Sequence, residues 1–184
     1  MNKTKNDLAV ALPLREKVKG PTMHRTKNDL SEDLRKKMIA VLNLRLADSI
    51  DLNLRAKHAH WNVKGPHFFA LHELFDKVAE GAEEWSDDLA ERAVQLGGIA
   101  EGLVSFVKDR SNLGEYPPDI FEGQDHVEAL SSTLAVFCRQ IRRDIDQAAK
   151  AGDQTTSDLF TEISRAADKQ LWFVEAHLQG RSNT

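Results

Sequence analysis

The chain has 184 residues, of which 41% are hydrophobic and 29% charged, and its formal net charge is −4 at pH 7. This composition is typical of one globular domain and excludes a collagen-like or wholly disordered chain. No apolar run is long enough to span a membrane, and the lysine-containing amino terminus lacks the apolar segment of a secretory signal. The single cysteine excludes an intrachain disulfide and a multi-cysteine metal site, so a reducing, cytoplasmic location is expected.

The charge is unevenly distributed along the chain. Residues 1–30 carry a net charge of +4, so the remaining 154 residues carry −8. We interpret residues 1–30 as a flexible, basic amino-terminal arm with a break at Gly20-Pro21; a partial repeat of its first residues leaves Met23 open as an alternative start. The cations of the arm are candidates for binding DNA phosphates: Lys3, Lys5, Arg15, Lys17, Lys19, Arg25 and Lys27.

Long stretches without proline and with few glycines predict four helices. Residues 31–64 begin with a capping serine, and residues 67–96, 124–151 and 155–179 carry apolar residues at helical spacing. No segment alternates with the period of a strand, so we predict an all-α four-helix bundle over residues 31–179, followed by a short tail at 180–184. The connection 97–123 is too long for a simple turn and is expected to hold a short extra helix within residues 99–110.

Single residues refine the predicted helices. Gly152 is suited to end the third helix, and Thr155 with Asp158 resembles the capping box that begins the fourth. The apolar stripes place Trp85 and Trp172 in the core, and Cys138 is expected to occupy a buried helix position.

Two pairs of metal-ligand residue types lie on the second predicted helix. His72 with Asp76, and Asp87 with Glu91, are each spaced i,i+4, and both pairs fall on the side away from the apolar stripe. The pairs cannot meet within one chain, because Asp76 and Asp87 are about 16 Å apart along a helix axis whereas metal–ligand bonds are about 2 Å long.

A second copy of the helix would solve this problem. His72 and Glu91 are symmetric about a point between Gly81 and Ala82, and so are Asp76 and Asp87. A two-fold axis at that point would set His72 against Glu91, and Asp76 against Asp87, of an antiparallel copy. The small side chains at this point are expected to let the two helices approach closely.

His60 completes the candidate site. His60 and His72 are equally spaced from Pro66, so a turn at Gly65-Pro66 is expected to bring them side by side. Imidazole and carboxylate ligands without thiolate suit iron, with zinc or manganese as alternatives. The remaining interpretation is a solvated, charged helix face that binds no metal.

Three segments resemble the Dps family, the DNA-binding proteins from starved cells, also called mini-ferritins: HWNVKGPHF at 60–68, HELFD at 72–76 and DDLAERA at 87–93. Residues 168–173 are similar to the last helix of that family, and the resemblance covers about 31–179. It implies a ferritin-like bundle in which His60, His72 and Asp76 of one chain join Asp87 and Glu91 of another. The pair of Glu-x-x-His motifs that marks ordinary ferritin sites is absent.

The resemblance also implies a function. It implies a hollow dodecamer that oxidises Fe(II), preferably with hydrogen peroxide, stores the ferric mineral inside and so protects DNA from oxidative damage. The alternatives are a mainly DNA-binding role through the basic arm, with nucleoid association, and an inert helical assembly.

Further residues gain expected roles from the resemblance. Trp61 would be an electron donor beside the site, with an interface aromatic as the equal alternative. Asp153 and Asp158 would line three-fold pores, although helix capping by either residue is the simpler account. His67 is weighed as an accessory ligand against an ordinary surface histidine, and His58 stays without a role. Three glutamates would face the cavity and nucleate mineral, unless they are only a solvated charge run: Glu80, Glu83 and Glu84.

Overall fold

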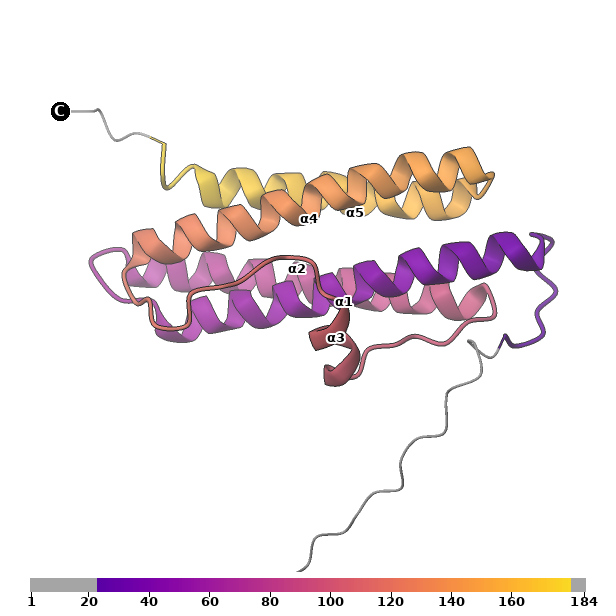
Figure 1. The fold of residues 1–184 in the computed structure, drawn as a ribbon. Coiled ribbons are helices and arrows are strands. Elements are labelled where there is room, and N and C mark those ends of the chain that lie inside the picture. The colour runs from indigo at the N-terminus through magenta and orange to yellow at the C-terminus, as the bar shows by residue number, and fades with distance from the viewer. Residues whose placement is uncertain (1–22, 180–184) are drawn as a thin grey trace, which may run out of the picture.

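Four long helices and one short helix make up the described part of the chain. The computed structural model describes residues 23–179. The helices are α1 (Glu32–Asn62), α2 (Phe68–Gln95), α3 (Val104–Arg110), α4 (Gly123–Ala151) and α5 (Gln154–Glu175) (Figure 1). Within this range there is no strand, only an isolated bridge between Lys64 and Glu122. The all-α bundle and its extra helix are therefore confirmed.

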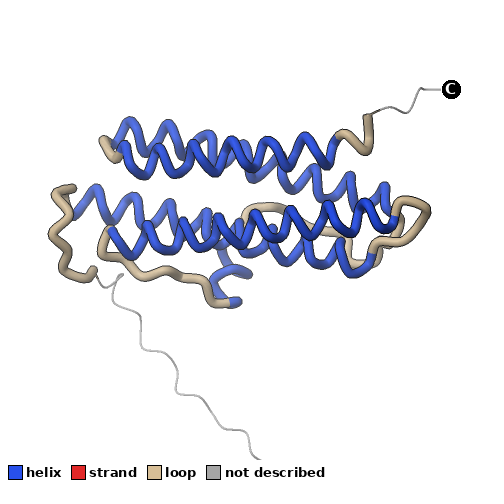
Figure 2. Tube along the Cα trace, turned by 180° about the vertical axis from the view of Figure 1, so that it is seen from behind, coloured by secondary structure: helices blue, strands red, loops and turns tan. Residues whose placement is uncertain are grey.

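Two helical hairpins stack to form the bundle. Helix α1 packs along α2, and α4 packs along α5, while α1 also contacts α4 and α2 contacts α5. The connection from α2 to α4 runs back along the bundle, with α3 protruding beside α1, so that α4 begins at the end where α1 turns into α2 (Figures 1 and 2). At that end the Lys64 amide donates to the Phe121 carbonyl at 2.9 Å.

The core is built from the apolar stripes of all four long helices. Its largest fully buried side chains include Phe75, Phe137 and Phe160. Trp85 stacks on Phe137 with 5.6 Å between ring centroids, which confirms its predicted place, and Cys138 is buried as expected. The predicted core position of Trp172 is wrong. Its side chain is 59% exposed, because it points outward from α5 while its neighbours reach the core.

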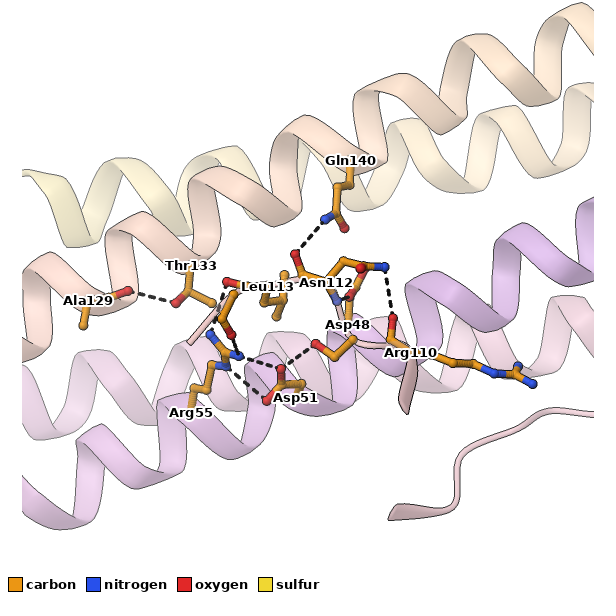
Figure 3. A network of polar contacts seen from close by, with 11 residues as sticks. Asp48, Asp51, Arg55, Arg110, Asn112, Leu113, Ala129, Thr133 and Gln140 are labelled. Carbon is orange, nitrogen blue, oxygen red and sulfur yellow. Dashed lines mark hydrogen bonds and ion pairs between the residues drawn. The ribbon is translucent and has the colours of Figure 1, made fainter. Parts of the chain in front are cut away.

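Helix α1 is covered on more than one side. Its buried residues include several polar ones, because the α3–α4 connection crosses it (Figure 3). The Asn112 amide donates to Asp48 at 2.7 Å, Arg55 of α1 donates to the Leu113 carbonyl at 3.3 Å, and Gln140 of α4 donates to the Asn112 carbonyl at 3.2 Å. These bonds fix the connection across the α1–α4 seam.

The helix ends follow local chemistry. Ser31 caps α1 by accepting from the Leu34 amide at 3.4 Å, and Gly152 ends α4 with φ +93°, both as predicted. The predicted start of α5 is wrong: Asp153, not Thr155, caps it by accepting from the Thr156 amide at 3.0 Å. Helix α5 ends at Glu175 rather than at 179, whereas α3 lies within the predicted residues 99–110.

The described amino-terminal residues lie on the bundle. Met23 and Leu30 pack against the core, and the His24 amide donates to the Gly97 carbonyl at 2.7 Å. Part of the predicted basic arm thus contacts the body at Met23, His24 and Leu30, and the bounds of the arm stay a prediction. Within residues 23–179, no helix combines the length and apolar character that a membrane crossing requires.

Candidate metal centre

The turn between α1 and α2 brings two histidines together. Gly65 adopts φ +109°, a conformation that L side chains rarely adopt, and reverses the chain between the two helices. His60, in the last turn of α1, then stacks on His72 of α2 with 3.6 Å between ring centroids and 22° between ring planes. The predicted adjacency of these two histidines is confirmed.

Reciprocal hydrogen bonds orient the two rings. Nδ1 of His60 lies 2.9 Å from the His72 carbonyl, and Nδ1 of His72 lies 2.9 Å from the His60 carbonyl. A carbonyl oxygen only accepts, so each Nδ1 must carry the proton and donate it. In the neutral form of each ring the lone pair then lies on Nε2, the arrangement in which histidine binds metals.

Asp76 lies one helical turn beyond His72, next to His60. Its Oδ1 is 3.8 Å from Nδ1 of His60 and 2.6 Å from Nζ of Lys57. The Lys57 ammonium lowers the pKa of Asp76, with His60 as a smaller cause, so this carboxylate is ionised at neutral pH. Sequence reasoning missed Lys57, although its position three residues before His60 puts both on one face of α1.

The other two predicted ligands lie farther along α2. Asp87 and Glu91 are exposed, and Asp87 lines a shallow groove between α1, α2 and the connection. Within residues 23–179, no group of three or more histidine, cysteine or acidic side chains in a single chain is arranged to hold a metal ion. The predicted ligands thus lie at two separate places on one chain, and their union by a second copy stays a prediction.

Of the two small residues expected where the helices cross, Ala82 is not available for the contact, while the two-fold crossing itself stays a prediction. Ala82 is fully buried in the core of its own chain. A Cβ added at Gly81 would meet Trp85 at 3.4 Å and Gln170 at 3.8 Å, both in the same chain. Ala82 therefore serves packing within one bundle, whereas Gly81 is only partly buried. The outward face at the centre of α2 carries Glu80, Glu83 and Glu84, all exposed.

Other candidate residues are placed as follows. Trp61 is 67% exposed, with Lys57 Nζ 6.0 Å from its ring centroid. His67 is exposed at the start of α2, and His58 instead contacts Tyr116 and His126.

The two predicted pore residues differ sharply. Asp158 is exposed, whereas Asp153 is buried, caps α5 and pairs with Arg92 at 2.9 Å. The capping alternative is therefore realised at Asp153. Among the predicted DNA-binding cations, Arg25 and Lys27 are exposed, and five lie outside the described residues: Lys3, Lys5, Arg15, Lys17 and Lys19.

Comparisons with known proteins agree with this geometry. The ferritin-like domain family matches residues 39–182. The chain is 46% identical over 159 residues to the DNA protection during starvation protein of Agrobacterium fabrum, covering 86% of this chain and 98% of that protein. DpsA14 from Streptomyces coelicolor superposes with a TM-score of 0.82 at 33% identity, covering 88% of this chain and 95% of that one. Dps from Microbacterium arborescens in the high iron form gives 0.77 at 31% identity, covering 84% and 99%.

The chain folds into a four-helix bundle with an extra helix in its central connection, and the ferritin-like domain family matches most of its length. These two findings define a ferritin-like protein. Within that class the chain belongs to the Dps family, as the resemblance of its motifs implies.

Proposed function

We propose that the protein oxidises Fe(II) at a site shared between two copies of the chain and stores the ferric product inside a hollow homo-oligomer, expected to be a dodecamer. The reciprocal bonding of His60 and His72 carries this proposal, because it turns both Nδ1 atoms to carbonyl oxygens and leaves each Nε2 for a metal, with the Asp76 carboxylate 3.8 Å from Nδ1 of His60. The chain's relatives support iron chemistry, since one of them was solved in a high iron form.

Hydrogen peroxide is the proposed oxidant. Two Fe(II) ions supply two electrons, the O–O bond breaks, and two protons are taken up to give two waters and two Fe(III) ions. Because peroxide receives both electrons together, no hydroxyl radical is released. This two-electron reduction would protect DNA. The role of this chain's residues is to bind and orient: the histidines supply neutral donors and Asp76 supplies negative charge. Zinc or manganese would fit the same ligand types.

The second half of each site comes from the partner chain in this proposal. Asp87 and Glu91 are exposed and too far from His72 to join it, so a two-fold axis must supply them. Trp61 is proposed as an electron donor beside the site and Asp158 as a lining residue of the cation pores. Asp153 can contribute to a pore only weakly, since Arg92 balances its charge. The exposed glutamates of α2 would nucleate mineral in the cavity of a cytoplasmic shell.

Complementation between two inactive variants tests the shared site. Asp76→Ala and Asp87→Ala damage opposite halves, so each alone should lose most peroxide-driven iron oxidation. When the two are unfolded together and reassembled, about half of the two-fold interfaces are mixed, and each mixed interface has one intact site. About a quarter of the wild-type rate should return.

The controls separate the shared site from a general defect. Glu73→Ala, an exposed acidic residue of α2 outside the candidate site, should keep the wild-type rate through the same unfolding. No recovery in a mixture of correctly sized assemblies would refute a site divided between chains. No iron oxidation by the wild-type protein would refute the proposed function itself.

DNA binding through the amino-terminal residues is a second candidate function, favoured by the exposure of Arg25 and Lys27 and by the net charge of +4 over residues 1–30. Because the rest of the chain is acidic, binding should depend on this segment and should weaken as salt rises. Gel retardation of DNA by the full chain and by a variant that begins at Met23 tests this. Equal retardation by both would exclude the residues before Met23 from binding.

A further inference from the structure

Residues 23–30 form a docked segment that lies against the end of α2. Met23 and Leu30 pack against the core, and the His24 amide donates to the Gly97 carbonyl at 2.7 Å. Gly97 has no room for a side chain, because an added Cβ would lie 2.7 Å from the His24 carbonyl oxygen. The end of α2 is therefore shaped to receive the backbone of this segment.

Side chains hold the docked segment in its conformation. The Thr26 hydroxyl accepts from the Asn28 amide at 3.1 Å, and the Asn28 side-chain oxygen accepts from the Leu30 amide at 3.0 Å. Arg35 of α1 donates to the Leu30 carbonyl at 3.1 Å and to the Leu96 carbonyl of α2 at 2.9 Å. Arg35 thus ties the segment to both helices.

The first eight residues of the chain repeat the docked segment. Residues 1–8 read MNKTKNDL, and residues 23–30 read MHRTKNDL. The two positions that differ are those of His24 and Arg25, which are both exposed, and His24 bonds Gly97 only through a backbone amide that any residue except proline supplies. The half-buried residues recur at the matching positions of residues 1–8: Met23, Thr26, Asn28 and Leu30. Residues 1–8 therefore carry every group that the docked segment uses.

We propose that residues 1–8 are a second docking segment, which exchanges with residues 23–30 of the same chain at the end of α2. The exchange closes residues 9–30 into a loop whose two ends lie side by side, next to the α1 cap Ser31. Closing this loop costs conformational entropy, which the direct connection of residues 23–30 to α1 avoids. The structure with residues 23–30 docked is therefore the major form, and the exchanged structure is the minor form.

The exchange regulates which cations are held against the body. In the major form Arg25 and Lys27 belong to the docked segment, and residues 1–22 are attached to the body at one end only. In the minor form Lys3 and Lys5 take the docked positions, and residues 9–30 are attached at both ends. A segment attached at both ends reaches roughly half as far from the body as one of equal length attached at one end.

Chemical cross-linking in the full-length protein tests the exchange. Cys138 is buried, so a short bismaleimide joins only cysteines introduced at exposed positions. Gln95→Cys, at the exposed end of α2, is combined with Lys3→Cys in residues 1–8 or with Arg25→Cys, the matching position of the docked segment. We expect a link from position 3 to position 95 within one chain, with a yield several-fold below that from position 25.

Three variants make the test specific. Glu16→Cys is closer than Lys3→Cys to the docked segment along the chain, so chance encounters favour it, yet it should link to position 95 several-fold less. Leu8→Asp removes an apolar anchor of residues 1–8 and should lower the yield from position 3 to that of Glu16→Cys. Met23→Asp weakens the competing segment and should raise the yield from position 3 several-fold.

Assembling isotope-labelled and unlabelled chains together shows whether each link lies within one chain. Links between labelled and unlabelled chains would overturn the proposal in favour of docking on a second copy. A yield from position 3 no higher than that from position 16, or one that Leu8→Asp leaves unchanged, would refute the docking of residues 1–8.

Discussion

Asp153 offers the sharpest test of how this bundle is held together. Its carboxylate is buried between two helices, where it accepts from Arg92 of α2 at 2.9 Å and from the amide and hydroxyl of Thr156 at 3.0 and 2.5 Å. Arg92 itself donates to the Thr156 hydroxyl at 2.9 Å. Asp153→Ala would therefore remove both the cap of α5 and the partner of a buried guanidinium.

The expected cost follows from these two losses. Breaking a buried ion pair costs about 3–5 kcal/mol, and losing a helix cap costs about 1 kcal/mol. The two share one carboxylate, so we expect Asp153→Ala to lower the free energy of unfolding by about 4 kcal/mol in total. Asp153→Asn keeps an oxygen for the cap and should cost about 1 kcal/mol less.

Urea unfolding followed by helical circular dichroism measures these costs at a fixed protein concentration. Asp158→Ala is the matched control, because this exposed aspartate lies in the same helix, and it should change stability by less than about 0.5 kcal/mol. Adding Arg92→Met to Asp153→Ala should recover part of the loss, because no unpaired charge then stays buried. A cost below about 1 kcal/mol for Asp153→Ala would refute this account of the α2–α5 contact.

Three further predictions concern single residues. Lys57→Met removes the ammonium partner of Asp76. Because this ion pair is only partly buried, the affinity for zinc at pH 7, measured by calorimetry, should rise up to about fivefold. Weaker zinc binding would mean that Lys57 orients the carboxylate instead. Gly152→Ala forces φ +93° on a residue with a Cβ in otherwise open space, so it should cost about 1 kcal/mol in urea unfolding; no loss would mean that the α4 end does not need this conformation. Burial raises the pKa of Asp48 and Asp144 despite Arg45 between them, so the folded chain keeps protons that the unfolded chain releases near pH 4. Their contribution to stability therefore falls as pH rises above about 4, and Asp144→Asn should flatten that fall in unfolding curves measured across pH, whereas an unchanged slope would contradict it.

The sequence by itself determined the helices and much of the candidate site. Helical periodicity is a local property, so spacing alone located the apolar stripes and put the pairs at 72, 76, 87 and 91 on the outward face of α2. The distance of His60 and His72 from Pro66 predicted their adjacency because a tight turn leaves little freedom between two packed helices.

Only the tertiary structure decided which neighbour each face meets. The carbonyl partners that fix both imidazole tautomers, and the ammonium of Lys57 against Asp76, belong to the other helix of the hairpin. Sequence spacing likewise could not tell that Trp172 faces outward. Nor could it tell that Asp153 would meet Arg92 across 61 residues, because such contacts depend on how whole helices pack rather than on the residues beside them.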